Sequence, residues 1–271
     1  MSYTFSRQGW KKNGRFDLEG ICRVARELDI DGADMVSTYD LPPAEIRRVL
    51  ADYGIAPVCY TFGAGLNFST LAERSAGVDA VKAGVDIAAA IGAPLIMVIT
   101  PGEQGVPRDV SRRQFVRGLQ ESADFARQAG IAMSIENFPG ADSPFVVSSD
   151  VLEAIREVPG LKLTYDNGNV FQGGEDPAVS FTKCAPHVVH AHFKDWILAE
   201  PGKGTEGLDG RRYQAALIGE GIVPHCACLA AMKQAGYKGY INIEYENNKY
   251  PPDEATRRAA DYLLDLMEEL K

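Results

Sequence analysis

Residues 131–168 decide the fold of this chain, and they read IAMSIENFPGADSPFVVSSDVLEAIREVPGLKLTYDNG. The stretch begins with the apolar run IAMSIENF (131–138), ends with the apolar run LKLTYDNG (161–168), and has helical spacing in SDVLEAIREV (149–158) between them. Short apolar runs bounded by Gly, Pro or Asp are typical of buried parallel strands, which need a helical crossover to join them. The stretch therefore predicts one strand–helix–strand unit.

The same alternation continues on both sides of this unit. Further apolar runs are GADMV (32–36), IAPVCYTF (55–62), PLIMVIT (94–100), VVHAHFKD (188–195) and YINIEYEN (240–247). Further segments with helical spacing are LEGICRVARELD (18–29), PAEIRRVLADYG (43–54), AGVDAVKAGVDIAAAIGA (76–93), RRQFVRGLQESADFARQAG (112–130) and DEATRRAADYLLDLMEELK (253–271). The repeated alternation predicts an α/β fold with a parallel sheet.

The number of repeats favours a closed barrel. Seven strands are clear, and SYTFS (2–6) is expected to supply a short eighth. Strand and helix repeated eight times form a (β/α)8 TIM barrel, which typically needs about 250 residues, so we expect one domain over residues 1–271. An open doubly wound sheet is the alternative, but no GxGxxG follows the first strand. The longest irregular stretch, from Trp196 to Gly221, is expected to lie over the active site.

Composition limits the partners and the compartment. The formal net charge of −9 argues against a nucleic-acid partner, which would need a basic face. The five cysteines are scattered and have no paired CxxC units, so neither a disulfide framework nor a structural zinc site is expected. The sequence has no apolar run of the kind that a signal peptide or a membrane span needs, so neither is expected. The expected compartment is a reducing cytoplasm.

Acidic and imidazole side chains stand at the ends of the later strands. Glu136 closes AMSIE and Asp166 closes LKLTYD, while His192 lies in HAHFKD and Glu244 lies in INIEYE. The carboxyl ends of parallel barrel strands converge on one face, and a charged group buried there must be paired or bind a metal. Carboxylates and an imidazole suit a divalent ion, for which we expect Mn²⁺, with Mg²⁺, Co²⁺ and Zn²⁺ as alternatives.

At these residues the chain resembles the sugar isomerase/epimerase superfamily with a xylose isomerase-like TIM barrel. The matching pieces, in order along the chain, are SIEN (134–137), DNGN (166–169), AHFKD (191–195), IGEGIVP (218–224) and AGYKGYINIEYE (235–246). The superfamily also contains endonuclease IV, inosose dehydratases, hydroxypyruvate isomerases and ketose 3-epimerases. The resemblance implies the barrel, a divalent ion, the same four ligands, and a homodimer or a hetero-oligomer as the assembly.

Two positions depart from the pattern of the superfamily. Asn169 stands where many relatives have the histidine of DxGH, and Asp142 stands where ketose 3-epimerases have a glutamate. The chain contains only four histidines, so the three-metal site of the endonuclease branch is not expected. We therefore expect a site for a single ion.

The expected activity is that of a divalent-metal-dependent isomerase or epimerase of a sugar or keto-sugar. Proton transfer would proceed through a metal-bound enediolate, with Glu136 or Glu244 as the catalytic base. The first alternative is a dehydratase or lyase that eliminates a β-substituent from a keto-sugar, keto-cyclitol or keto-glycoside. The second alternative is a non-catalytic binding or assembly subunit that keeps the barrel.

Other polar and aromatic residues near the strand ends are candidates for substrate contact. Lys194 is also compatible with a structural ion pair to Asp195. The candidate substrate-binding residues are Tyr60, Phe62, Asn137, Asp142, Asn169, His190, Lys194, Trp196 and Glu246.

Overall fold

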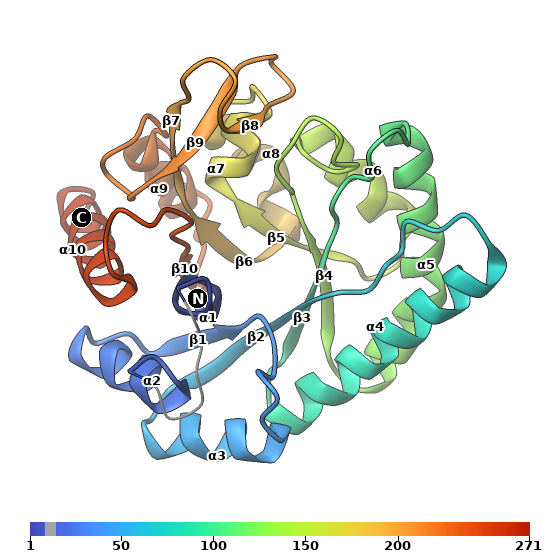
Figure 1. The fold of residues 1–271 in the computed structure, drawn as a ribbon, viewed down its shortest axis with the longest axis horizontal. Coiled ribbons are helices and arrows are strands. Elements are labelled where there is room, and N and C mark those ends of the chain that lie inside the picture. Colours follow the sequence, from blue (N-terminus) through green and yellow to red (C-terminus); the bar gives the residue numbers. More distant parts are fainter. Residues whose placement is uncertain (9–14) are drawn as a thin grey trace.

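The computed structural model describes residues 1–8 and 15–271. Within that part of the chain, seven parallel strands form one sheet in the order β1-β2-β3-β4-β5-β6-β10. They are β1 (Gly32–Met35), β2 (Ala56–Gly63), β3 (Leu95–Ile99), β4 (Ala132–Glu136), β5 (Lys162–Asp166), β6 (Val188–Phe193) and β10 (Ile241–Ile243). Figure 1 shows the strands curving around a centre, as in a nearly closed barrel. The predicted α/β barrel is confirmed.

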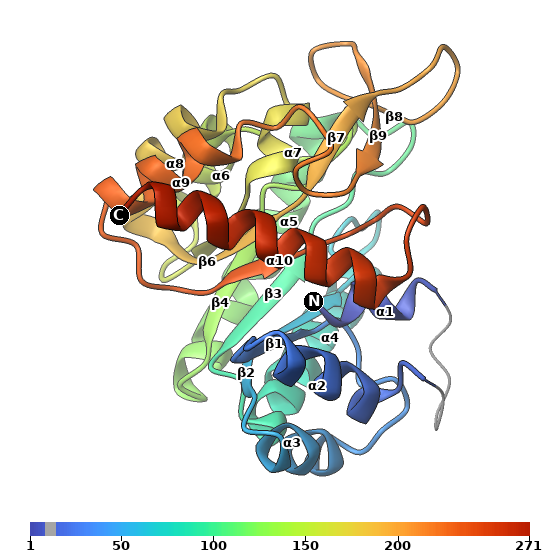
Figure 2. The same cartoon turned by 90° about the vertical axis from the view of Figure 1, so that its left-hand side faces the viewer.

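Helices follow the strands and cover the outside of the sheet (Figures 1 and 2). They are α2 (Leu18–Glu27), α3 (Pro43–Asp52), α4 (Leu71–Ile91), α5 (Arg108–Gln128), α6 (Ser148–Glu157), α7 (Asn167–Gln172), α8 (Pro177–Cys184), α9 (His225–Gln234) and α10 (Pro252–Glu269), with a 3-10 turn at Ala185–His187. Their apolar faces pack on the sheet and form one large core with it. That core holds the strand ends in fixed positions.

Helix α4 illustrates how local sequence sets an element. The Thr70 side chain accepts from the backbone N–H of Glu73, and the Glu73 side chain accepts from the backbone N–H of Thr70, so a capping box begins the helix. The helix ends at Gly92, whose φ of 90° is left-handed and favours glycine. The long apolar face between these caps packs on β2 and β3.

The N-terminal segment differs from the prediction. SYTFS forms the helix α1 (Ser2–Ser6) and not an eighth strand, so β1 and β10 remain the edges of the described sheet. The Ser2 hydroxyl accepts from the N–H of Val36 (2.9 Å), just after β1, and the Thr4 hydroxyl accepts from the N–H of Tyr245 (3.0 Å), just after β10. Hydrogen bonds to two hydroxyl groups thus link this segment to both edges without β-ladder pairing. A five-residue sequence pattern does not distinguish this arrangement from a short strand.

The stretch from Trp196 to Gly221, predicted to be irregular, contains regular structure. Strands β7 (Asp195–Leu198), β8 (Thr205–Glu206) and β9 (Arg212–Ala216) form a small antiparallel sheet in the order β7-β9-β8. Figure 2 shows this sheet projecting from one end of the barrel. The prediction that the stretch is irregular is wrong. Its strands are short, have little apolar sequence of their own and are joined by Gly-rich turns, so the apolar pattern that indicates a strand is missing.

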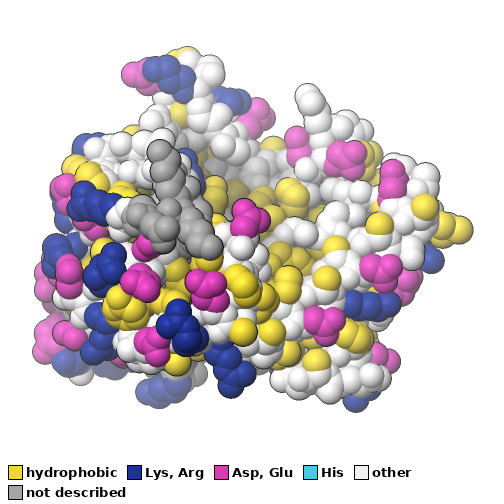
Figure 3. All heavy atoms as spheres, turned by 60° about the horizontal axis from the view of Figure 1, so that its bottom comes forward, with side chains coloured by type: hydrophobic (Ala, Val, Ile, Leu, Met, Phe, Trp, Pro, Cys, Tyr) yellow, Lys and Arg dark blue, Asp and Glu magenta, His cyan; other side chains and the backbone are white. Residues whose placement is uncertain are grey.

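Acidic and basic side chains are mixed on the surface. The face in Figure 3, which brings the lower edge of Figure 1 forward, shows both signs of charge side by side. Ion pairs one helical turn apart, Arg23 with Glu19 on α2 and Arg48 with Asp52 on α3, account for part of this pattern. None of the described helices is long and apolar enough to span a membrane. All five cysteines are free, and four of them are buried, whereas Cys226 is exposed.

Candidate metal centre

The four residues predicted as ligands meet at the carboxyl ends of their strands. Glu136 ends β4, Asp166 ends β5, His192 lies in β6, and Glu244 directly follows β10. Each offers one ligand atom, and these atoms all lie within 4.8 Å of one another. All four side chains are buried. The parallel strands thus bring residues from distant parts of the sequence to one point.

The ring of His192 lies between carboxylates on both sides. Its Nδ1 is 2.7 Å from Oε1 of Glu136 and 3.5 Å from Oε2 of Glu244. Its Nε2 is 2.9 Å from Oδ2 of Asp34. Burial by itself lowers the pKa of this imidazole, but the charge of Glu136 and the hydrogen bond to Asp34 raise it well above its usual range. The surroundings of the ring therefore favour positive charge.

Lys194 brings a second positive group into the same cluster. Its Nζ lies 3.3 Å from Oδ2 of Asp166, 3.1 Å from Oε1 of Glu244 and 3.3 Å from Oε1 of Glu246. Burial opposes the charge of this ammonium group, yet the surrounding carboxylates raise its pKa well above the usual range. A buried cation at this point indicates that the cluster of carboxylates is suited to positive charge.

Burial raises the pKa of two carboxylates in the cluster. Burial, with repulsion from Glu136 and Glu244, raises the pKa of Asp166 well above its usual range despite Lys194. Burial also raises the pKa of Glu246 to about 7, with Glu244 adding to the effect of burial and Lys194 opposing it. The negative charges are thus crowded, and the positive charge of Lys194 does not balance them all.

Two carboxylate oxygens in the cluster lack a hydrogen bond. Within the described residues, Oδ2 of Asp166 and Oε2 of Glu244 are buried and accept none, and each has an ion-pair contact instead, with Nζ of Lys194 (3.3 Å) and Nδ1 of His192 (3.5 Å). A carboxylate oxygen has two lone pairs, so these contacts leave capacity for a cation. Carboxylate oxygens and an imidazole nitrogen within coordinating distance of one another are what a divalent ion requires. The residues present therefore fit a divalent cation.

A cavity of about 160 Å³ opens onto this cluster. Its polar walls include Glu136, Lys194, Glu244 and Glu246, and Thr61 from the middle of β2 also lines it. Lys194 and Glu246, two of the residues predicted to contact a substrate, thus lie in its wall. A small molecule in this cavity would lie directly against the carboxylates.

Two predicted asparagines lie beside Asp166. The side chain of Asn137 donates to the carbonyl of Asp166 (2.6 Å) and accepts from its N–H (2.9 Å), so it positions the backbone of a candidate ligand. The N–H of Asn169 donates to Oδ1 of Asp166 (2.7 Å), while both polar atoms of the Asn169 side chain are buried without a partner among the described residues. Asn137 therefore supports the cluster, and Asn169 has free hydrogen-bonding capacity.

Tyr60 and Phe62 were predicted to contact a substrate, and the structure places them on the other side of β2. Side chains alternate along a strand, and Thr61 between them points toward the cavity. Tyr60 and Phe62 therefore pack in the core under the helices, where a Cβ on Gly84 of α4 would lie only 2.1 Å from the Phe62 ring. The prediction missed this alternation.

Trp196, Asp142 and His190 also lie away from the cavity. Trp196 packs with Tyr213 under the small antiparallel sheet, and Asp142 is exposed in a loop. His190 faces Asp34, with its Nε2 3.3 Å from Oδ2. His190 and His192 do share one side of β6, as predicted, but they lie at different depths.

The alternative of an ion pair between Lys194 and Asp195 is wrong. Lys194 points to the carboxylate cluster, whereas Asp195 accepts from the N–H groups of Gly219 (3.0 Å), Gly221 (2.9 Å) and Val223 (3.0 Å). Lys194 lies between β6 and β7, and its side chain and that of Asp195 thus have different partners. Asp195 thus anchors the chain that follows the small sheet.

The prediction missed Asp34, a buried carboxylate of β1 that contacts both histidines of β6. A signal was present in the sequence, because an aspartate inside the apolar run GADMV needs a partner. The histidine partners could not be identified from the sequence, since His190 and His192 are 156 and 158 positions away.

Comparison with known proteins places this architecture among known families. The family model of the xylose isomerase-like TIM barrel matches residues 22–266. The crystal structure of the IOLI protein with a bound zinc atom has the same fold, with a TM-score of 0.75 and 16% identity over 92% of each chain.

Two relatives are enzymes that act on sugars or cyclitols. Inosose dehydratase of Lacticaseibacillus casei is 26% identical over 155 residues, which are 54% of this chain and 51% of that protein. L-ribulose-5-phosphate 3-epimerase UlaE of Salmonella paratyphi C is 28% identical over 180 residues, which are 64% of this chain and 57% of that protein. The matches span only about half the length of these relatives. The match of the family model is far longer, and on that ground this chain belongs to the xylose isomerase-like TIM barrel family.

Proposed function

We propose that this protein is a divalent-metal-dependent isomerase or epimerase of an uncharged keto-sugar. The observation that carries the proposal is the convergence of Glu136, Asp166, His192 and Glu244, with two buried carboxylate oxygens that accept no hydrogen bond from the described residues. These four residues would hold the cation. When bound, a divalent cation would act as a Lewis acid that polarises the carbonyl of the substrate.

Glu136 and Glu244 are the proposed proton carriers. Both line the cavity, so both are within reach of a substrate bound there. One of them would remove the proton from the carbon next to the carbonyl, and return of a proton to the opposite face, or to the neighbouring carbon, would complete epimerisation or isomerisation. The apolar walls, which include Met97 and Ile99, would limit the access of water.

The charge of the cavity supports a substrate without phosphate. Among the described residues that line it, Lys194 is the only basic side chain, and its ammonium group already contacts three carboxylates. A phosphate would meet Glu136, Glu244 and Glu246 without a free arginine or lysine to neutralise it. Hydroxyl groups of a neutral sugar would instead donate hydrogen bonds to carboxylates such as Glu246.

A dehydratase is the second candidate, and the raised pKa of Glu246 favours it. The match to inosose dehydratase gives a precedent for elimination in the family. Glu246 lines the cavity, and burial raises its pKa to about 7, so it would donate a proton to a hydroxyl group that leaves from the β-carbon. The same first proton removal would serve both reactions.

Deuterium exchange tests the proposal. The protein, first stripped of metal with a chelator, would be incubated in D₂O with Mn²⁺ and a panel of neutral keto-sugars and keto-cyclitols. After removal of protein and metal, NMR spectra would report deuterium at the carbon next to the carbonyl and the structure of the product. A matched sample without Mn²⁺ is the control.

Exchange that requires Mn²⁺ supports an enzyme, and the product then distinguishes epimerisation or isomerisation from elimination. Metal binding without exchange for any compound would contradict the proposal and favour a non-catalytic binding or assembly subunit. Exchange at the same rate in the chelated sample would contradict the role of the metal.

A further inference from the structure

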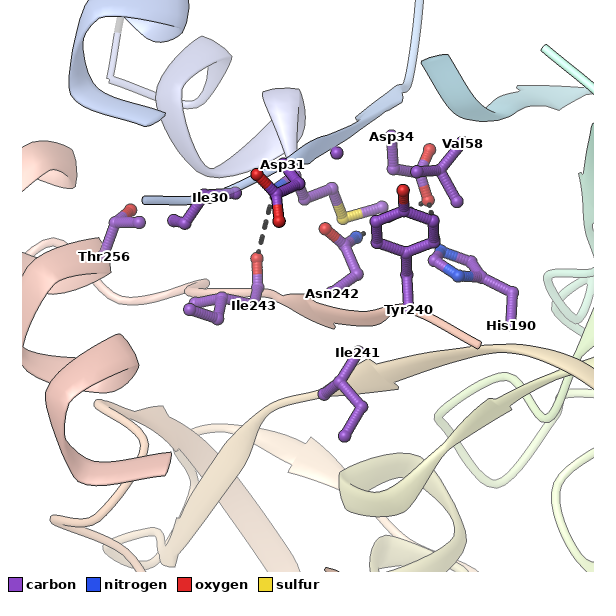
Figure 4. Close-up of a pocket in the computed structure, with 12 residues that line it drawn as sticks. Ile30, Asp31, Asp34, Val58, His190, Tyr240, Ile241, Asn242, Ile243 and Thr256 are labelled. Carbon is purple, nitrogen blue, oxygen red and sulfur yellow. Dashed lines mark hydrogen bonds and ion pairs between the residues drawn. The ribbon is translucent and has the colours of Figure 1, made fainter. Parts of the chain in front are cut away.

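Asp34 of β1 is surrounded by hydrogen-bonding groups of other strands. Its Oδ2 lies 2.9 Å from Nε2 of His192 and 3.3 Å from Nε2 of His190, while its Oδ1 accepts from the Thr61 hydroxyl (2.9 Å). The amide of Asn242 donates to Oδ2 from 3.5 Å. Figure 4 shows Asp34 and His190 pointing toward each other, with Asn242 beside them. Asp34 is 1% exposed, so water does not compete for these contacts.

The chemistry of Asp34 decides which nitrogen of His192 carries hydrogen. A carboxylate only accepts hydrogen bonds, so Nε2, which faces Asp34, must be a donor. Without a cation, Nδ1 would likewise donate to Glu136. A cation held by Glu136 and Nδ1 would take the electron pair of Nδ1, and the single N–H of the neutral ring would then be the one that Asp34 holds at Nε2. Nδ1 is the atom that faces Glu136 and Glu244, at 2.7 and 3.5 Å.

We infer that Asp34 is a positioning residue that fixes His192 in the tautomer whose Nδ1 faces the cation. The inference rests on the proposed function, in which His192 is a ligand. Partners of this kind orient a coordinating histidine and raise its basicity, and their removal costs about 10- to 100-fold in metal affinity.

A purely structural role for Asp34 makes a different prediction. Its side chain joins β1 to β2, β6 and β10, and β1 and β10 are unpaired edges of the described sheet. If it only held these strands together, its loss would lower the free energy of unfolding and leave the coordination of His192 unchanged. The experiment must therefore observe the ring itself.

The first measurement is ¹⁵N NMR of the histidine rings in the wild-type protein, with zinc as the probe. We expect the Nε2–H proton of His192 to exchange slowly with and without zinc, and zinc to shift the Nδ1 signal. A zinc-induced shift of Nε2 with a retained proton on Nδ1 would overturn the inference. This result needs no variant to fold.

The second measurement compares zinc affinity, by chelator competition, in Asp34→Asn and Ser134→Ala. Asn has the same shape as Asp but adds an N–H₂ group, so it no longer forces both histidines to donate. We expect Asp34→Asn to weaken zinc binding by about 10-fold. Ser134 is also buried in the barrel, where its hydroxyl group hydrogen-bonds to Thr164 (2.8 Å) and to the carbonyl of Ile96 (3.0 Å) and not to Asp34 or His192, so its variant is the matched control for lost stability.

Unchanged zinc affinity in Asp34→Asn, or an equal loss in both variants, would refute the positioning role. A wild-type protein that binds no zinc would instead contradict the proposed metal site. The metal-free protein would then still test the role of Asp34. Slow exchange of the Nε2–H proton of His192 in the wild type, with fast exchange in Asp34→Asn, would support that role. Slow exchange in both proteins would refute it.

Discussion

Two buried aspartates at the carboxyl end of the barrel, Asp166 and Asp195, serve opposite purposes. Asp195 accepts hydrogen bonds at both oxygens, from the backbone N–H groups of Gly219, Gly221 and Val223. Asp166 accepts from Asn169 at Oδ1, but its Oδ2 accepts none from the described residues. The two residues are 0% and 1% exposed, so burial does not distinguish them.

What distinguishes them is how completely the protein satisfies the carboxylate. A folded chain rarely leaves a buried acceptor unpaired unless a ligand or another function requires it. Asp195 is fully used in holding the loop after β9, which makes it a structural residue. Oδ2 of Asp166 accepts no hydrogen bond from the described residues and has an ion-pair contact with Lys194 at 3.3 Å. Asp166 lies together with three other candidate ligands, which makes it suitable for a cation.

The largest expected effect is on turnover. Changing Glu136 or Glu244 to Gln should lower kcat by at least about 100-fold, since each is a proposed proton carrier, while the fold persists. The assay is the deuterium exchange described above, with circular dichroism to verify folding. Glu121→Gln, on the surface of α5, is the matched control. Activity close to wild type in both variants would remove the proposed catalytic roles.

The next effect is on metal affinity. Asp166→Asn should weaken Zn²⁺ or Mn²⁺ binding by at least about 100-fold, because it removes a charged ligand. Asp195→Asn should leave the affinity unchanged, since Asp195 lies outside the cluster. Chelator competition measures both. The contrast between the aspartates would be broken if the two variants lost metal affinity equally.

The free energy of unfolding should depend more on Asp195 than on Asp166, the reverse of the metal affinity. Asp195→Asn should lower the free energy of unfolding by about 2 kcal/mol, because the new N–H₂ group must face backbone N–H donors. Urea unfolding of the metal-free protein measures the loss. Hydrogen exchange of residues 217–223 should rise with it, and no local change in exchange would argue against the anchoring role.

The smallest expected effect is that of Asp166→Asn on the metal-free protein. The free energy of unfolding should change by less than about 1 kcal/mol, because Asn can still cap α7 and because relief of the repulsion from Glu136 and Glu244 offsets the lost attraction to Lys194. The same urea experiment measures it. A loss as large as that of Asp195→Asn would mean that Asp166 is also a structural residue.

The sequence by itself predicted the seven strands, most of the helices and the four residues that converge. These features depend on local patterns, since apolar runs and helical spacing determine each element, and the parallel arrangement then places every strand end on one face. Glu136, Asp166, His192 and Glu244 needed no further information than their place at those ends.

Only the tertiary structure decided the surroundings of these residues. It turned SYTFS into a helix, directed Tyr60 and Phe62 away from the cavity, and brought Asp34 to His192 from 158 positions away. Contacts of this kind depend on the register between strands and on how far the barrel closes. Local patterns contain no information on either, because both are set by the packing of the whole sheet against its helices.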